Sequence, residues 1–169
     1  MVERPLSDPR EIRLRPATEA DHPVVARLID EWWGERRPHV ARVWFRHFAG
    51  LSWVAERTDG RPVGVGIGAR GHDRPLVGLL VLVAVAPSFR RQGVARSLGE
   101  AVGRSLEAAG ATSTEAIVWP GNRVGVRFLE ALGFGPAAEA VDQLYGVPAI
   151  ADFDGEGEDR AIFVRGRQG

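Results

Sequence analysis

Apolar positions in the first fifty residues recur first at strand spacing and then at helical spacing. Residues 12–15 form a short strand pattern. The segment Thr18–Asp21 is typical of a helix start, and the apolar residues after it recur at helical spacing through Trp32, which predicts a helix ending near Gly34. A second helix is predicted from about Pro38 to Ala49. The chain is therefore expected to open with one strand and two helices.

The middle of the chain carries three strand patterns. Leu51–Arg57 and Val63–Arg70 are joined by a turn whose Asp59-Gly60 step suits a hairpin, so these two strands are expected to pair antiparallel. Leu76–Ala86 is almost continuously apolar, as in a strand that is buried on both faces. This segment is the predicted central strand.

Helix and strand patterns alternate from residue 93 onward. A helix is predicted from Gly93 to Ala109, a strand from Thr112 to Trp119, and a helix from Asn122 to Leu132. In the first of these helices one apolar stripe is expected to face the sheet: Val94, Leu98, Val102 and Leu106. In the second helix Val124, Phe128 and Leu132 are aligned. Because strand-helix-strand order favours parallel neighbours, a mixed α/β sheet is expected.

The last third of the chain is expected to close the sheet. Val141–Tyr145 and Arg160–Arg165 are the two predicted closing strands. Between them lies the acidic loop, residues 152–159, with the sequence D-F-D-G-E-G-E-D. We expect one domain over residues 11–169, after a flexible segment of residues 1–10.

Composition narrows the class of protein. The 22 basic and 22 acidic residues cancel, which argues against a nucleic-acid-binding or membrane-surface protein. The absence of cysteine excludes disulfides, thiolate metal sites and cysteine nucleophiles. The first ten residues lack the apolar core of a signal peptide, and no apolar run is long enough to span a membrane. A soluble protein in the cytoplasm is expected.

The junction between the central strand and the next helix is the strongest candidate for chemistry. The start of a helix presents unpaired N–H groups and a partial positive charge, which suit a phosphate. Gly93 allows close approach of the backbone, and Arg90, Arg91 and Arg96 add positive charge. A diphosphate suits this loop. The alternative is an ordinary strand-to-helix connection with solvated arginines.

Two motifs in this half of the chain resemble those of the GNAT superfamily of acyl-CoA N-acyltransferases. R-R-Q-G-V-A, beginning at Arg90, matches the R/Q-x-x-G-x-G/A loop of that superfamily, and it follows a V-x-P sequence. N-R-V-G-V-R-F-L-E-A-L-G-F, residues 122–134, resembles the second motif. The resemblance covers roughly residues 12–165. It implies the GNAT fold, in which a central, splayed, mixed sheet of six or seven strands is flanked by about four helices.

The resemblance also implies a binding mode for acetyl-CoA. The pantetheine arm would pair with the main chain near Val83 and Val85, and the diphosphate would lie on the backbone amides from Arg91 to Arg96. Asn122 would line the far side of the cofactor, although its position also suits a helix N-cap. The expected cofactor-binding residues are Val83, Val85, Arg90, Arg91, Gln92, Gly93, Val94, Ala95, Arg96 and Asn122.

One catalytic position departs from the superfamily pattern. Many members carry a tyrosine in the second motif that protonates the departing thiolate, and here Leu129 occupies that position. The chain's one tyrosine, Tyr145, and water are the remaining candidates for the acid. Glu56 and Glu115 are weak candidates for a general base, since strand carboxylates usually face solvent or pair with arginine.

The resemblance implies that the first two helices, their connection and the last two strands bind the acceptor. Trp33 and Glu35 in that connection are weak candidates for substrate contacts. The acidic loop would favour a cationic amine, of a small molecule or a peptide, although a solvated and mobile loop explains its composition equally well. Similar enzymes are commonly homodimers, which leaves a homodimer open.

Several other functions are less favoured by the sequence. The glycine run of residues 64–68 lacks the third glycine and the following helix of a dinucleotide fingerprint. The four histidines have no metal-ligand spacing, so no metal is expected.

The sequence therefore predicts an N-acetyltransferase that moves the acetyl group of acetyl-CoA to a primary amine by direct attack in a ternary complex. A non-catalytic CoA-binding sensor is the alternative, because Leu129 stands at the usual acid position.

Overall fold

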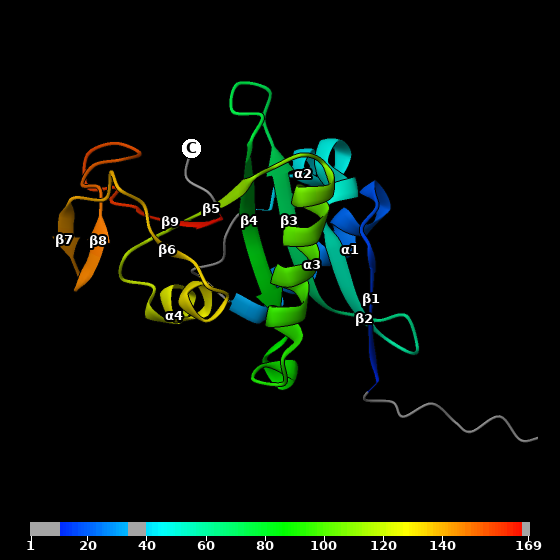
Figure 1. Ribbon diagram of the computed structural model, residues 1–169. Helices are drawn as coiled ribbons and strands as arrows, with labels where there is room; N and C mark the ends of the chain where they lie inside the picture. Colours follow the sequence, from blue (N-terminus) through cyan, green and yellow to red (C-terminus); the bar gives the residue numbers. More distant parts are fainter. Residues whose placement is uncertain (1–10, 34–39, 167–169) are drawn as a thin grey trace, which may run out of the picture. The chain divides into compact units, whose positions relative to one another are not determined.

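The computed structural model describes residues 11–33 and 40–166 (Figure 1). The predicted flexible segment, residues 1–10, lies outside this range. The strands are β1 Ile12–Pro16, β2 Trp53–Arg57, β3 Pro62–Arg70, β4 Val77–Val85, β5 Ser113–Val118, β6 Gly135–Pro136, β7 Asp142–Leu144, β8 Val147–Ala149 and β9 Ala161–Gly166. The α-helices within the described range are α1 His22–Trp33, α2 Arg42–Phe48, α3 Val94–Ala108 and α4 Arg123–Ala131. None of them is both long and apolar enough to cross a membrane.

Seven of the strands form one mixed sheet in the order β1-β2-β3-β4-β5-β9-β6. β1, β2 and β3 pair antiparallel, β4 and β5 pair parallel, and β9 pairs antiparallel with both β5 and β6. Helix α3 connects the two strands of the parallel pair along the chain, as the strand-helix-strand pattern predicts. The predicted mixed α/β sheet of six or seven strands is confirmed.

The chain packs into two compact units. The first comprises Met1–Ile67 and Leu82–Val102, and the second comprises Gly68–Val81 and Gly103–Gly169. In the first unit, buried residues of β2, β3, β4 and α3 form one cluster: Ala55, Val63, Val85, Ala86, Val94 and Leu98. In the second unit, Leu106, Ala116, Val126, Leu129, Phe134 and Phe163 are buried. The expectation of a single domain over residues 11–169 stays a prediction.

Helix α3 packs closely on the sheet because glycines lie beneath its apolar side. A Cβ atom built on Gly66 would lie 3.0 Å from Val102 Cγ2, and one built on Gly78 would lie 2.8 Å from Leu106 Cδ1. The predicted apolar stripe of α3 is confirmed, since Val94, Leu98, Val102 and Leu106 are all buried. Within strand β3, Gly64 and Gly66 therefore leave room for the side chains of Leu98 and Val102 on α3.

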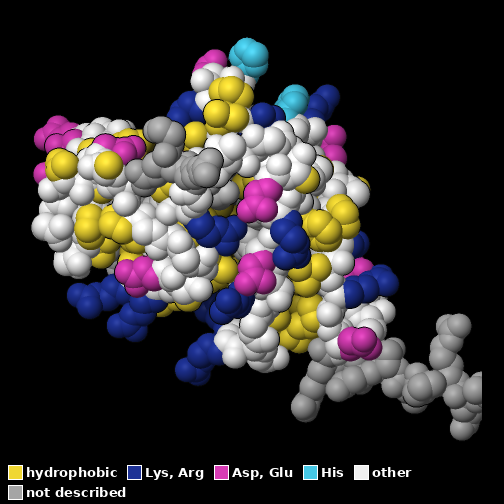
Figure 2. Space-filling model, in the orientation of Figure 1, with side chains coloured by type: hydrophobic (Ala, Val, Ile, Leu, Met, Phe, Trp, Pro, Cys, Tyr) yellow, Lys and Arg dark blue, Asp and Glu magenta, His cyan; other side chains and the backbone are white. Residues whose placement is uncertain are grey.

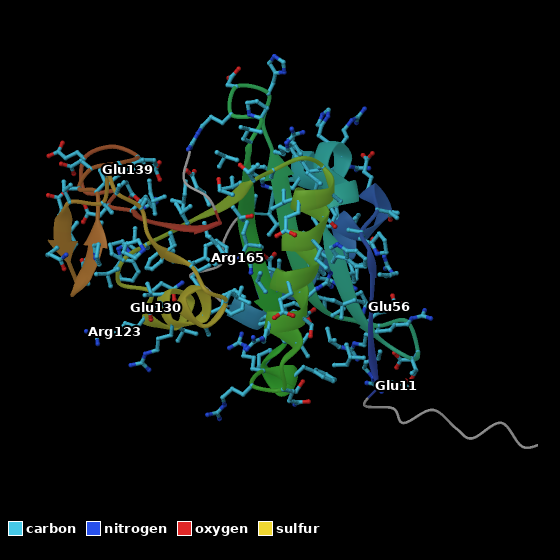
Figure 3. The ribbon with its side chains drawn as sticks, in the orientation of Figure 1. Glu11, Glu56, Arg123, Glu130, Glu139 and Arg165 are labelled. Atoms are coloured by element: carbon cyan, nitrogen blue, oxygen red, sulfur yellow. The ribbon has the colours of Figure 1, made fainter. Side chains whose placement is uncertain are left out.

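A buried carboxylate holds β1 to β2 in the first unit. Glu56, labelled in Figure 3, is 3% exposed and accepts hydrogen bonds from Arg13 Nε at 2.7 Å and from Arg15 Nε at 2.8 Å. Arg15 also makes a bidentate pair with Asp21, at 2.7 and 2.9 Å. The Asp21 carboxylate accepts the Thr18 N–H in turn, which confirms the predicted helix-start signal.

This arrangement shifts the pKa values of its carboxylates. Burial raises the pKa of Glu56, but the hydrogen bonds from Arg15 and Arg13 outweigh burial, so the pKa lies below the usual value. The hydrogen bonds from Arg15 likewise hold the pKa of Asp21 below its usual value. Both carboxylates are therefore ionised at neutral pH and tie β1 to its neighbours.

The last third of the chain differs from the expected pattern in two places. The aligned residues of α4 are buried only in part, because Val124 is 80% exposed whereas Leu132 is 7% exposed, and the buried residues within the helix are Val126 and Leu129. The segment Val141–Tyr145 does not close the main sheet. Its central residues form β7, which pairs with β8 in a separate two-stranded sheet, and the short strand β6 takes the place next to β9. The second predicted closing strand is confirmed as β9.

Candidate active site

Strand β4 leaves its parallel neighbour after a short ladder. The pairing of β4 with β5 runs only from Val77↔Ser113 to Leu79↔Glu115, although β4 continues to Val85. On the other side, the Ala86 N–H donates to the Val63 carbonyl of β3 at 2.8 Å. Because main-chain groups alternate between the two sides of a strand, those of Val83 and Val85 point away from β3. Within the described residues, neither has a ladder partner on β5.

The chain then makes a strained turn into helix α3. A 3-10 helix, Pro87–Phe89, follows β4, and α3 begins at Val94. Between them Arg91 has φ 58° and Gly93 has φ 83°, both in the left-handed region. This conformation costs little for glycine but is unfavourable for arginine. Backbone strain of this kind is concentrated at functional sites in proteins.

The first turn of α3 contains amide groups that have no partner within the helix. The first helical hydrogen bond of α3 runs from the Ser97 N–H to the Gly93 carbonyl at 3.0 Å, so the N–H groups of Val94, Ala95 and Arg96 have no partner within the helix. A Cβ atom built on Gly93 would meet nothing within 4 Å. Gly93 is thus required by its φ angle and not by crowding, and the space above its backbone is open to an anion.

The polar side chains of the loop divide into two groups. Two of them hold the loop together: Arg90 Nε donates to the Val85 carbonyl at 3.0 Å, and Gln92 Nε2 donates to the Ser88 carbonyl at 2.9 Å. Arg96 forms an exposed pair with Glu100 at 2.9 Å, one helical turn along α3. Arg91 is exposed and has no hydrogen-bond or ion-pair partner among residues 11–33 and 40–166. Among the polar side chains of this loop, Arg91 is therefore the one whose charge is not paired within the described residues.

Asn122 is the N-cap of α4. Its Oδ1 accepts the Gly125 N–H at 3.0 Å, and its own N–H donates to the Trp119 carbonyl at 2.9 Å. The predicted capping role is thus confirmed. The capping hydrogen bond leaves the side-chain NH₂ group of Asn122 as a donor for a ligand.

Leu129, which occupies the usual acid position of the family, and the acid candidate Tyr145 lie on different elements. Leu129 is 5% exposed and belongs to the buried side of α4. Tyr145 is 59% exposed and lies in the turn between β7 and β8. Its ring contacts that of Trp119, with centroids 5.4 Å apart. The sequence analysis missed Trp119, although an aromatic residue between a strand and a capped helix is a signal that could have identified it.

Glu115, the first candidate for the base, is engaged by an arginine. Arg74 Nη1 and Nη2 donate to its two carboxylate oxygens at 2.9 and 2.6 Å, and these hydrogen bonds raise the pKa of Arg74. Glu56 is similarly paired with two arginines on β1. Both carboxylates therefore follow the arginine-paired alternative that the sequence left open. Arg74 is a partner that the sequence analysis did not name.

The acceptor candidates are only partly described. Trp33 is the last residue of α1, but its side chain and the whole of Glu35 lie outside the described residues.

The acidic loop is held by hydrogen bonds, since the Gly157 N–H donates to Asp152 and the Asp152 N–H donates to Asp159. Arg160 pairs with carboxylates of the same loop at 2.7 and 2.9 Å. These contacts favour an ordered acidic loop over a mobile one. No cluster of three or more metal-binding side chains occurs in the described part of the chain.

The amino-acid sequence that includes the strand-to-helix junction matches a known protein family. Residues 10–134 match the Acetyltransferase (GNAT) family. The chain belongs to this family. The predicted GNAT superfamily is therefore confirmed.

Solved structures and a curated relative agree with this assignment. The fold is similar to that of a GNAT-family acetyltransferase from Desulfovibrio desulfuricans, with a TM-score of 0.73 at 20% identity, covering 92% of this chain and 99% of the other. It is also similar to the diaminobutyrate acetyltransferase of Paenibacillus lautus, solved with L-2,4-diaminobutyric acid and coenzyme A, with a TM-score of 0.68 at 24% identity, covering 92% and 95%. The L-2,4-diaminobutyric acid acetyltransferase of Streptomyces avermitilis is 36% identical over 86 residues, which span 50% of this GNAT chain and 48% of that relative.

Proposed function

We propose that the protein is an N-acetyltransferase that transfers the acetyl group of acetyl-CoA to a primary amine by direct attack in a ternary complex. The single observation that carries the proposal is the junction of β4 and α3. Its open amides, its left-handed Arg91 and Gly93, and its family motif fit the diphosphate of a CoA thioester. The amides from Arg91 to Arg96 bind the diphosphate, and Arg91 adds the charge.

Strand β4 holds the pantetheine arm in this proposal. The main-chain groups of Val83 and Val85 point away from β3, and the ladder to β5 ends at Leu79. This supports pairing of pantetheine with the main chain of Val83 and with the N–H of Val85, whose carbonyl accepts Arg90 Nε. The N–H of Val83 then donates to the thioester oxygen and stabilises the oxyanion that forms during attack. The side-chain amide of Asn122 contacts the cofactor while its Oδ1 keeps the helix cap.

The chemistry of transfer requires little beyond positioning. The neutral amine attacks the thioester carbon, the C–N bond forms, the C–S bond breaks, and the thiolate leaves. Water accepts the proton that the amine loses, because Glu115 and Glu56 are both committed to arginines. A thiolate with a pKa of about 8.5 is a tolerable leaving group at neutral pH, so it takes its proton from water without a tyrosine at position 129.

A cationic amine is the proposed acceptor. Every charged side chain between residues 137 and 159 is acidic, and this segment includes the β7–β8 hairpin and the acidic loop. The segment therefore creates a negative field that attracts ammonium groups. The relative from Streptomyces avermitilis, an L-2,4-diaminobutyric acid acetyltransferase, has an acceptor with two amino groups. Small diamines and diamino acids are the first acceptors to test.

The second candidate function is a CoA-binding sensor without turnover. Leu129 favours it, because the tyrosine that protonates the thiolate in many GNAT members is replaced by a buried leucine. Both functions need the CoA site, and only the acetyltransferase needs an acceptor.

The expected cytoplasmic location and homodimer stay predictions. Size-exclusion chromatography with light scattering measures the oligomeric state.

Two measurements test the proposal. In a thermal shift assay, acetyl-CoA and CoA should raise the melting temperature while ATP and NAD do not, since a ligand that binds only the folded state stabilises it. Release of free thiol from acetyl-CoA is then followed with a panel of amines: L-2,4-diaminobutyric acid, spermidine, a cationic peptide and L-glutamate. Turnover with a cationic amine supports the enzyme. Binding of CoA without turnover supports the sensor, and the absence of any CoA-specific shift overturns both.

A further inference from the structure

The two most exposed large hydrophobic side chains among residues 11–33 and 40–166 lie in the second unit, and each is next to a charged residue. Val124 in the first turn of α4 is 80% exposed, and Val141 just before β7 is 78% exposed. A single exposed apolar residue is common on protein surfaces and needs no explanation. Here, however, Val124 directly follows Arg123, and Val141 comes two residues after Glu139. The two valines therefore lie beside charges of opposite sign.

The β7–β8 hairpin and the start of α4 are connected through side-chain contacts. The ring of Tyr145, in the hairpin turn, and the ring of Trp119, after β5, have centroids 5.4 Å apart. The Trp119 ring also lies beside Gly121, since the three atoms nearest to a Cβ built on Gly121 belong to that ring. The Trp119 carbonyl accepts the N–H of Asn122, the N-cap of α4, at 2.9 Å. Both rings are exposed and add to the apolar surface of this part of the unit.

The sequence keeps the Tyr145 ring on this surface against the preference of its backbone. Leu144 pairs with Val147, so Tyr145 and Gly146 form a two-residue hairpin turn, with φ 56° and 77°. Asn-Gly or Asp-Gly suits such a turn best, and tyrosine is unfavourable in the left-handed region. An exposed residue in an unfavourable conformation indicates that its side chain has a role in binding.

The charges on this surface are not neutralised within the chain. The side chains of Arg123, Arg127 and Glu139 are exposed and have no hydrogen-bond or ion-pair partner in the described part of the chain. Glu139 contributes to the raised pKa of Arg74 but makes no ion pair with it. Helix α4 also carries Glu130, which leaves the helix with a net positive charge. Figure 2 shows hydrophobic side chains over the β7–β8 part, with acidic side chains above them and basic side chains below. A partner of a single charge sign would leave one of these groups uncompensated.

We propose that this surface binds the same surface of a second copy of the chain. In a two-fold symmetric dimer, residue i of one copy meets residue j of the other, and j meets i. Figure 3 shows Arg123 and Glu139 at opposite ends of the part of the second unit that carries the hairpin. A two-fold axis between them places Arg123 against Glu139 of the partner subunit, twice in each dimer. Val124 then packs against Val141 of the partner subunit, and the interface covers the two aromatic rings. This inference goes beyond the proposed function, because it involves neither CoA nor the acceptor.

Charge reversal tests this pairing. Arg123→Glu places two glutamates at both contacts of the dimer, and Glu139→Arg places two arginines there. Because like charges across an interface repel, each variant should raise the dissociation constant of the dimer at least about tenfold. Sedimentation equilibrium over a series of protein concentrations measures this constant.

A mixture of the two variants gives the sharpest result. When Arg123→Glu and Glu139→Arg proteins are mixed in equal amounts, each contact of the mixed dimer joins a glutamate and an arginine. The mixture should therefore dimerise with a dissociation constant close to that of the wild type, although neither variant does so alone. Restored dimerisation also shows that both variants are folded.

Control variants separate the proposed surface from general effects of charge. Arg104→Glu and Glu107→Arg reverse charges at exposed positions of α3 in the same unit, and both should leave the dissociation constant unchanged. Val124→Ser and Val141→Ser remove apolar contacts without changing the charge, and each should weaken the dimer. Circular dichroism checks that all of these variants keep their secondary structure.

Three results would overturn the proposal. A wild-type protein that stays monomeric over the whole concentration series has no such interface. A dimer that persists unchanged in both charge-reversed variants uses another surface. Variants that are monomeric alone and remain monomeric in the mixture lack the reciprocal pairing. None of these results affects the CoA site, which the thermal shift assay tests separately.

Discussion

The Nε–H of Arg90 donates a hydrogen bond to the main-chain carbonyl of Val85 at 3.0 Å. Arg90 stands at the first position of the R-R-Q-G-V-A motif, where its charge suggested a phosphate contact. Its Nη2 also lies 3.4 Å from the Trp32 carbonyl at the end of α1. Arg90 thus links the end of the central strand to the loop that begins α3, and Arg91 beside it carries the unpaired charge.

Substitution of each of these two neighbouring arginines should therefore affect CoA binding in a different way. Arg91→Met should raise the Kd for CoA about tenfold at low salt, because a charge-assisted contact with phosphate is lost, and the difference should shrink at high salt. Arg90→Met should lower the melting temperature and weaken CoA binding to a similar degree at both salt concentrations. Isothermal titration calorimetry at low and high salt measures both effects. Equal salt dependence in the two variants contradicts the division of roles.

Gly93 should be needed for its backbone conformation and for the access that it gives to the amides. Gly93→Ala places a side chain at φ 83° and should cost about 1–2 kcal/mol of stability and weaken CoA binding. Gly60→Ala is the matched control, since Gly60 has φ 80° and equally open surroundings in the β2–β3 turn. Both variants should lose stability in urea unfolding, but only Gly93→Ala should bind CoA more weakly. Equal CoA affinity in the two variants would argue against the site.

The carboxylates of the β1–β2 network should make stability depend on pH in the acid range. The folded-state pKa values of Glu56 and Asp21 are lowered, so their contribution is complete above the unfolded values of about 4 and is lost as the pH falls through the folded values. The unfolding free energy should therefore decrease from about pH 4 downward. Urea unfolding over a pH series measures this decrease.

Glu56→Gln is the comparison for that pH series. The variant should be less stable at neutral pH by about 2 kcal/mol, because two arginines lose their charged partner, and its stability should fall less steeply in acid. Glu107→Gln, on an exposed position of α3, should behave as the wild type. Parallel curves for Glu56→Gln and the wild type would show that this carboxylate does not provide the pH dependence.

Glu115 should act through its pair with Arg74 and not as a general base. Glu115→Gln should lower kcat less than about tenfold, whereas loss of a general base typically costs about a hundredfold or more. The acid limb of the kcat/KM profile should stay in place, since it reports the ionisation of the essential base. A displaced acid limb together with a hundredfold loss would identify Glu115 as the base.

The order and type of most elements followed from local patterns. Continuous apolar character predicted β4, and four-residue spacing predicted the buried side of α3. The phosphate-binding role of the loop between them stays a prediction. These features depend on residues close together in the chain. The same reasoning was only partly right for α4, where Leu132 is buried but Val124, at the same helical spacing, is exposed. Spacing alone does not determine which of two mixed sides of a short helix meets the sheet.

The sequence by itself determined the R-R-Q-G-V-A motif, the central strand β4 and the following helix α3. Each of these depends on contiguous residues and on their backbone preferences. The tertiary structure decided which charged groups pair: Glu115 with Arg74, Glu56 with Arg13 and Arg15, and Arg90 with the Val85 carbonyl. It also brought Trp119 to Tyr145 across 26 positions of the chain. Such contacts depend on strand register and on hairpin geometry, which bring together residues that no local pattern relates.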